Sequence, residues 1–255
     1  MRFHNDNAPT RFIVLDLEFL SDRQLYNRYR VRDPRPADMR WPFRRVVAAS
    51  VMALEVIDQR LEVSAFKTFS GPAEDRLLNE LFAFLRERPQ HMLCTWGGAS
   101  ADMPVLRLAA MEHGLKLPPQ LKPTAQAHRV HLDLAIALRG GAGEFVHMSE
   151  VATRLNIPSK LAGFASYVPQ WAAQGNWRAV SALADADTVT TAMILAAHLD
   201  SQGAILSCKA GLLAIIRHVR PLRGREPWAA LLGNTAERLK REISQEIDRW
   251  IARVA

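Results

Sequence analysis

The sequence of 255 residues has only two cysteines, Cys94 and Cys208, and no long apolar run. Two cysteines cannot form a disulfide framework or a zinc ribbon, so a reduced protein is favoured and we predict a cytoplasmic one. The longest uncharged apolar run, from Val46 to Leu54, is far shorter than the roughly 18–20 residues of a membrane helix. The N-terminal region is acidic and lacks an apolar segment with a cleavage site, so we expect neither a signal peptide nor a membrane partner.

Positive charge is what the sequence has in excess. Lys and Arg number 33 against 26 Asp and Glu, which gives a net charge of +7 and a pI near 9.9. Residues 21–45 hold eight Arg against three Asp, and residues 203–255 hold ten Lys or Arg against five acids, so the rest is mildly acidic. Concentrated basic segments indicate a polyanionic partner, which is most often nucleic acid.

Apolar patterns predict an α/β domain followed by helices. A continuous apolar strand is expected at 11–20, followed by a basic insertion with a short helix and a strand pair at 45–57 and 61–70. Helices and strands then alternate as helix 74–87, strand 92–96, helix 101–113, strand 129–136, a helix from Ser149 to Asn156 and a helix from Asn176 to about His198. We divide the chain into a domain of residues 10–202, with the basic insertion at 21–43, and a helical extension at 203–255.

The extension is expected to form three helices. The first covers 203–219, the second begins at Pro227 and ends at Gly233, and Asn234 with Glu237 resembles a capping box that begins the third. The third helix carries one apolar stripe, and we expect that stripe to pack on the domain rather than to form a dimer seam. The residues of the stripe are Leu239, Ile243, Ile247, Trp250 and Val254.

Carboxylates at unusual positions are the candidate catalytic groups. Asp16 and Glu18 close the first strand and, because strand side chains alternate, project on the same side roughly 6.6 Å apart. Two like charges on a buried strand are costly unless a hard cation such as Mg²⁺ or Mn²⁺ neutralises them. The simpler explanation of this tripeptide alone is that the strand has reached its exposed end.

Two further aspartates occur later in the chain. Asp102 follows a Gly-Gly-Ala-Ser turn at a strand-to-helix junction, where an acid also serves as an ordinary helix start. Asp187 lies in the middle of a predicted helix, where Asp is a poor helix former or marks a solvated face. Asp185, two residues earlier, is turned about 200° away on a helix and is not expected to share a site with Asp187.

Together these segments resemble the DEDD superfamily of 3′–5′ exonucleases, and most of all the predicted exonucleases related to the exonuclease domain of family B DNA polymerases. The likeness covers about residues 10–200 in the right order. The segments that carry it are Phe12–Glu18 (FIVLDLE), Thr95–Leu106 (TWGGASADMPVL), His131–Leu134 (HLDL), Ser149–Lys160 ending in NIPSK, and the pair Asp187 and Thr191.

The resemblance implies a ribonuclease-H-like fold, with a mixed five-stranded sheet that contains one antiparallel strand and is flanked by helices. It implies that Asp16, Glu18, Asp102 and Asp187 hold two ions of Mg²⁺ or Mn²⁺. Two such ions activate water and stabilise the leaving oxygen of a phosphodiester. The implied activity is release of nucleoside monophosphates from the 3′ end of single-stranded DNA or RNA.

The sequence departs from the family at the base that orients the attacking water. The family places a Tyr four residues, or a His five residues, before the last Asp, and this chain has Leu183 and Ala182 there. His147 and Asp133 are candidates for a replacement base or a supporting residue, and His131 is a further candidate base. Three hypotheses therefore stay open: an active exonuclease, a weak or inactive module that binds nucleic acid, and a nuclease that cuts internal bonds.

Nucleic-acid contacts are expected in the basic insertion, where aromatic and arginine side chains alternate. Aromatic rings stack on unpaired bases and arginines bind phosphates, although the same residues could pack on the domain or lie in solvent. Lys160 is expected to contact a phosphate or to cap a helix. The arginines at 217, 220, 223 and 225 are expected to lie in a solvated loop rather than to line a groove. The candidate binding residues are Tyr26, Arg28, Tyr29, Arg30, Trp41 and Lys160.

Overall fold

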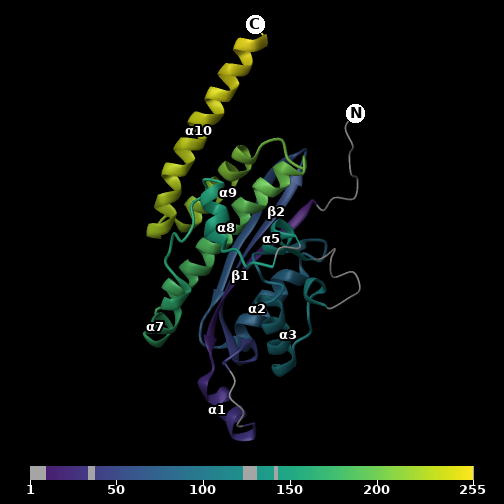
Figure 1. Cartoon of the computed structure of the whole chain (residues 1–255), viewed down its shortest axis with the longest axis vertical. Helices are drawn as coiled ribbons and strands as arrows, with labels where there is room; N and C mark the ends of the chain where they lie inside the picture. Colours follow the sequence, from purple (N-terminus) through teal and green to yellow (C-terminus); the bar gives the residue numbers. More distant parts are fainter. Residues whose placement is uncertain (1–9, 34–37, 123–130, 141–142, 255) are drawn as a thin grey trace.

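A mixed five-stranded sheet forms the centre of the protein (Figure 1). The structure is a computed structural model that describes residues 10–33, 38–122, 131–140 and 143–254. The strand order is β3-β2-β1-β4-β5, and β2 runs opposite to the other four strands, which are parallel to one another. This topology confirms the predicted α/β fold. The strands are β1 Arg11–Ser21, β2 Arg44–Ile57, β3 Arg60–Ser70, β4 Met92–Thr95 and β5 His131–Asp133.

Helices cover both faces of this sheet (Figure 1). They are α1 Arg23–Arg32, α2 Glu74–Arg86, α3 Asp102–Glu112, α5 Leu134–Arg139, α6 Met148–Arg154, α7 Val168–Ala173, α8 Trp177–Ser201, α9 Cys208–Arg223 and α10 Pro227–Val254. Short 3₁₀ turns lie at η1 Trp41–Phe43, η2 Pro119–Leu121 and η3 Ala165–Tyr167.

The alternation of β1 separates two cores. Phe12 and Val14 face the side where α8, α9 and α10 pack, whereas Ile13 and Leu15 face α2 and α3. Because Asp16 continues the even-numbered series, its side chain also belongs to the α8 side of the sheet. The sheet therefore points the predicted carboxylates of β1 at the longest helix of the domain.

Helix α8 is the core helix of the domain. It begins after Asn176, whose side chain accepts a hydrogen bond from the backbone N–H of Ala179 at 3.2 Å, as predicted. Among the described residues it alone has the length and hydropathy of a membrane span, but 89% of that apolar window is buried within the fold. Its apolar character is therefore explained by packing on β1, β2 and β3.

Several predicted boundaries were wrong. Strand β5 ends at Asp133, because this side chain caps α5 and turns the chain into a helix where a strand to residue 136 was expected. Ser149 is not a cap, since α6 already begins at Met148. Helix α9 begins later than expected, after the capping Ser207, and continues through Pro221. Helix α7 was not predicted. Residues 123–130, which include the start of the predicted strand at 129–136, and residues 141–142 lie outside the described residues.

The C-terminal extension differs most from prediction. Asn234 and the predicted capping box lie inside α10, which is one continuous helix. The stripe packs on the domain only in its first half: Leu239 is 3% exposed, whereas Ile247 and Trp250 are 53% and 65% exposed. The end of α10 projects from the molecule (Figure 1). Helices α9 and α10 share one hydrophobic core with α8. The predicted domain boundary at residue 202 stays a prediction.

Candidate active site

Three of the four predicted carboxylates converge between β1 and α8. Oxygens of Asp16, Glu18 and Asp187 all lie within 4.8 Å of one another. Glu18 and Asp187 are buried, with 5% and 8% of their surfaces exposed. Strand alternation and the packing of α8 on β1 thus bring together residues that are about 170 positions apart in the sequence.

This cluster leaves negative charge unsatisfied. Asp16 Oδ2 and Asp187 Oδ1 are buried and have no hydrogen-bond partner. The one cation that pairs with the cluster in the described part of the chain is Lys160, whose Nζ donates to Asp187 Oδ2 at 3.1 Å. The preceding loop is fixed to α8 by a 3.1 Å hydrogen bond from Thr190 Oγ1 to the carbonyl of Pro158. One ammonium therefore faces three carboxylates.

Burial and mutual repulsion raise the pKa values of these acids. Burial raises the pKa of Asp16 well above its usual range, and the charges of Asp187 and Glu18 raise it further. The pKa of Glu18 rises to about 8, first through burial and then through the charge of Asp187. Buried carboxylate oxygens without partners are suited to hard divalent cations, so the residues present fit Mg²⁺ or Mn²⁺.

Asp102 lies beside this group rather than in it. It begins α3 and is buried, and its pKa is raised to about 7 by burial and then by the charge of Asp133. Its own charge contributes to the raised pKa values of Asp16 and Glu18, so it lies within electrostatic range of the cluster. The Asp102 carboxylate packs against Gly98, where a Cβ would come within 2.7 Å of Asp102 Oδ2.

Asp133 shapes the turn that leads to Asp102. Its two oxygens accept hydrogen bonds from the backbone N–H groups of Gly97 and Ala99, each at 2.9 Å, and from that of Ala135 at 3.1 Å. A carboxylate with this many backbone donors is suited to holding the loop. This geometry fits the supporting role that we gave as an alternative to that of a base.

Neither candidate histidine belongs to the close carboxylate group. His147 is exposed at the start of α6 and places its ring edge-on to Phe145, with centroids 5.2 Å apart. His131 Nε2 lies 2.8 Å from Thr95 Oγ1, and burial lowers its pKa. A catalytic role for either histidine stays a prediction.

Leu183 forms an apolar wall at the position where the family has its base. It is fully buried with Val47, Ala48 and Val168, and Ala48 pairs with Glu18 across the sheet. The wall therefore lies beside the carboxylates but supplies no group that accepts a proton.

Asp185 lies outside the close group of Asp16, Glu18 and Asp187 and has partners of its own. It accepts hydrogen bonds from Ser50 Oγ at 2.7 Å and from Arg223 Nε at 2.7 Å, and a third from the Thr68 hydroxyl. Ser50 pairs with Asp16 on one side and Thr68 on the other, so these three side chains form one row across the sheet. The prediction that Arg223 is solvated was wrong, because it reaches into the interior to neutralise Asp185.

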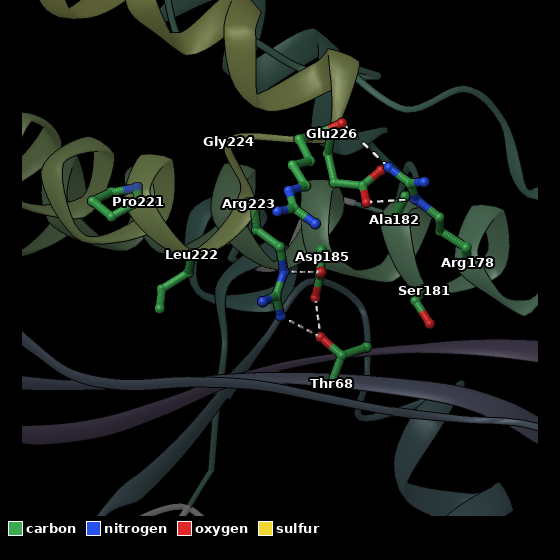
Figure 2. A pocket seen from close by; sticks show the side chains of 11 residues that line it. Thr68, Arg178, Ser181, Ala182, Asp185, Pro221, Leu222, Arg223, Gly224 and Glu226 are labelled. Atoms are coloured by element: carbon green, nitrogen blue, oxygen red, sulfur yellow. Dashed lines mark hydrogen bonds and ion pairs between the residues drawn. The ribbon is translucent and has the colours of Figure 1, made fainter.

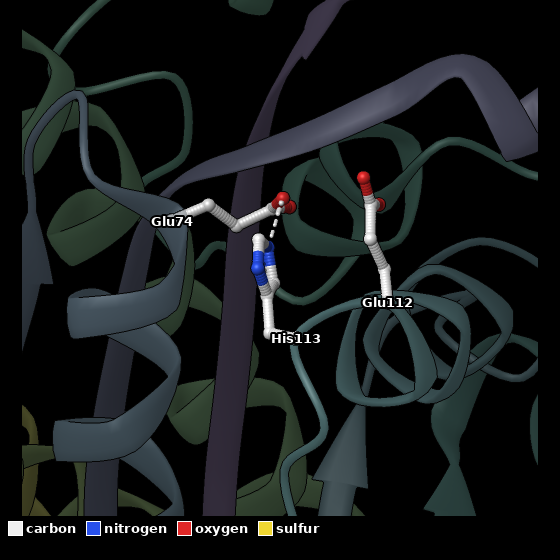
Figure 3. A group of neighbouring side chains, drawn as sticks. All are labelled: Glu74, Glu112 and His113. Atoms are coloured by element: carbon white, nitrogen blue, oxygen red, sulfur yellow. Dashed lines mark hydrogen bonds and ion pairs between the residues drawn. The ribbon is translucent and has the colours of Figure 1, made fainter.

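A second group of metal-type ligands was not predicted from the sequence. Glu74, Glu112 and His113 also lie close together, where the start of α2 meets the end of α3 (Figure 3). Arg45 forms ion pairs with both glutamates, and the backbone N–H of Val46 donates to Glu74 Oε1 at 2.6 Å. Only the spatial neighbours reveal this network, because its members are scattered along the chain.

The predicted nucleic-acid contacts of the basic insertion lie at one end of the molecule, on and beside α1 (Figure 1). Arg28 and Arg30 are exposed. The rings of Tyr26 and Tyr29 are half-buried and pack against Phe43, with centroids 5.2 and 5.4 Å apart. Trp41 is 39% exposed. The two tyrosines therefore form a small cluster with exposed arginines around it, and their binding role stays a prediction.

Solved structures share this fold. A family B DNA polymerase from the hyperthermophilic archaeon Pyrobaculum calidifontis aligns over 83% of this chain and 29% of its own, with 16% identity and a TM-score of 0.52. E. coli exonuclease I in complex with a dT13 oligonucleotide aligns over 76% of this chain and 41% of its own, with 10% identity and a TM-score of 0.47. The chain thus spans less than half the length of these proteins. No curated protein sequence matches it.

A family model matches residues 38–207, which is well over half of the chain. The matched range contains Asp102, Lys160 and Asp187, whereas Asp16 and Glu18 lie before it. The sheet topology and the shared fold agree with this match. The chain therefore belongs to the family of predicted 3′–5′ exonucleases related to the exonuclease domain of family B DNA polymerases.

Proposed function

We propose that this protein is a metal-dependent 3′–5′ exonuclease that hydrolyses the terminal phosphodiester of single-stranded nucleic acid. The observation that carries this proposal is the cluster of Asp16, Glu18 and Asp187, with its two buried oxygens that lack partners. Such a cluster is costly for a fold to keep unless a cation binds it. Its position within an exonuclease-family fold supports phosphodiester hydrolysis as the reaction.

Asp16, Glu18 and Asp187, with Asp102 beside them, would hold two ions of Mg²⁺ or Mn²⁺. When bound, such a pair of ions supplies an activated water and stabilises the leaving 3′ oxygen. The carboxylates are held ready for this by the rigid pairing of β1 with β2 and β4. Asp133 fixes the turn that presents Asp102.

Lys160 changes partners in this proposal. Without metal, its ammonium neutralises part of the charge of Asp187. With bound metal compensating the carboxylates, Lys160 would be free to leave this pairing and to bind a phosphate oxygen of the substrate. Because Leu183 replaces the usual base, we expect a modest rate, since general base catalysis typically contributes about 10²–10⁴-fold.

The missing base also favours a second candidate function. A module with the apolar Leu183 in the place of the base could bind single-stranded nucleic acid through the arginines of α1 without cleaving it. Such a module would show salt-dependent binding, since phosphate contacts release counterions. Turnover that depends on the carboxylates separates the two functions.

The test uses oligonucleotides labelled at the 5′ or the 3′ end, DNA and RNA, incubated with Mg²⁺, Mn²⁺ or EDTA. We expect stepwise shortening of the 5′-labelled strand and release of nucleoside monophosphate only with metal. Asp16→Ala should abolish shortening, and Glu112→Gln, which alters the second acidic group, should preserve it. Equal activity in Asp16→Ala, or cutting of a circular strand, would contradict the proposal.

A further inference from the structure

The turn between α9 and α10 separates two hollows that the carboxylate site does not use. The first, of about 640 Å³, lies between α8, β3 and residues 221–226 (Figure 2). Three arginines and two acids line it, and each acid already has a partner: Arg223 binds Asp185 and Arg178 binds Glu226 at 2.8 Å. The guanidinium of Arg225 is exposed and makes no ion pair in the described part of the chain. The first hollow therefore keeps an excess of positive charge.

The second hollow, of about 500 Å³, lies between α9 and α10. Its cations are Arg217, Arg220 and Lys240, and no acid lines it. Lys240 is paired with Glu237 at 2.7 Å, but Arg217 and Arg220 are exposed and form no ion pair with any described carboxylate. The remaining lining is mostly apolar, from Leu213, Ile216, Pro221, Ala229, Ala230 and Ala236.

These two hollows are neighbours, because Pro221 and Gly224 line both of them. Together they form a basic surface whose lining comes mostly from residues 203–255, one of the two segments with a net positive charge. The first hollow also borders the row of Asp16, Ser50 and Thr68, because Thr68 lines it. Asp185 lines it as well and lies two residues before Asp187 on α8. A ligand bound there lies against the helix that carries Asp187.

We propose that this α9–α10 surface is a second binding site for single-stranded nucleic acid, which holds the strand through its phosphates while apolar walls contact its bases. Guanidinium groups match phosphate oxygens in pairs, and a positively charged groove follows the backbone of a bound single strand without reading its sequence. The identity of the ligand rests on the proposed function. The site itself is tested by binding alone, without catalysis.

The experiment measures fluorescence anisotropy of a labelled dT20 and a labelled U20 in EDTA at several salt concentrations. The test variant is Arg217→Gln/Arg220→Gln, and the control Arg76→Gln/Lys116→Gln removes the same charge from exposed positions on the α2–α3 side. Each phosphate contact to a single strand contributes about 0.7 to the slope of log affinity against log salt. We expect the test variant to lose about 1.4 from this slope and the control to lose little.

Two further measurements separate this proposal from the proposed function. In an active enzyme, the test variant should raise KM for a 20-mer and leave kcat, and the hydrolysis of a dinucleotide, unchanged. If the wild type shows no nuclease activity but the slope still falls in the test variant, the binding site stands and the catalytic proposal fails. An unchanged slope would overturn the binding site whatever the activity, as would equal competition by polyglutamate of the same charge. Arg217→Lys/Arg220→Lys, which keeps the charge, should retain the slope.

Discussion

Two groups of metal-type ligands differ in how their charge is satisfied. The Asp16–Glu18–Asp187 cluster and the Glu74–Glu112–His113 cluster each bring three such side chains together. In the second, the guanidinium of Arg45 pairs with both glutamates and also with Asp22. In the first, a single ammonium contacts one oxygen, and two buried oxygens have no partner.

This difference shows that proximity of ligands does not by itself identify a metal site. Arg45 already acts as the cation of the second cluster, and its hydrogen bond and charge lower the pKa of Glu112. The pKa of Glu18 instead rises to about 8, because burial and the charge of Asp187 outweigh the opposing charge of Lys160. The unsatisfied cluster is the one that gains from a bound metal.

Loss of nuclease activity is the largest effect that we expect to separate the clusters. Asp187→Asn keeps the shape of the side chain but removes a charge that would hold the metal. Metal ions supply several kcal/mol of transition-state stabilisation, so the rate should fall by at least about a hundredfold. Glu112→Gln should retain near-normal kcat, and both rates come from single-turnover assays on a 3′-end substrate. Comparable losses in the two variants would break the comparison.

Metal-dependent stability should show the same separation without any substrate. A ligand present at a hundred times its Kd stabilises the native state by about 2.7 kcal/mol. Mn²⁺ should therefore raise the urea midpoint of the wild type and of Glu74→Gln, but not that of Asp16→Asn. Titration calorimetry on the same variants checks the stoichiometry. If the Mn²⁺ response disappears in Glu74→Gln, the metal binds at the Glu74–Glu112–His113 cluster, which contradicts this prediction.

Replacement of Arg45 should destabilise the Glu74–Glu112–His113 cluster and leave the Asp16–Glu18–Asp187 cluster unchanged. Arg45→Met leaves the buried Glu74 with only His113 as a possible ion-pair partner among the described residues, and it also removes the Arg45 ion pairs of Asp22 and Glu112. Breaking a partly buried network of this kind should cost about 2 kcal/mol in unfolding free energy. The response to Mn²⁺ should stay unchanged. Lys160→Met serves as the matched variant of the first cluster, and we expect it to cost less because Lys160 makes one contact.

The features that could be predicted from the sequence are those set by local periodicity or by a known motif, whereas contacts between distant residues that no motif links could not be predicted. The sheet, most helices and the convergence of Asp16, Glu18 and Asp187 followed from local periodicity together with family motifs. The network of Arg45 and the pairing of Arg223 with Asp185 did not, because each joins residues far apart in the chain that no motif links. Asn234 resembled a helix cap by its neighbours alone, and tertiary packing carried α10 through it.

The pH dependence of stability is the smallest and sharpest contrast. In EDTA, the raised pKa of Glu18 means that the native state holds a proton that the unfolded chain has released, so stability falls as pH rises from about 4.5 to about 8. The pKa values of Asp22 and Glu112 are lowered, so their contribution is lost as pH falls through the acidic range. Urea unfolding between pH 2 and 9 should show Glu18→Gln flattening the first slope by about 1 kcal/mol per pH unit, and Glu112→Gln flattening the second. Mn²⁺ should remove the first slope in the wild type, because a metal binds the deprotonated carboxylates and takes the place of their protons.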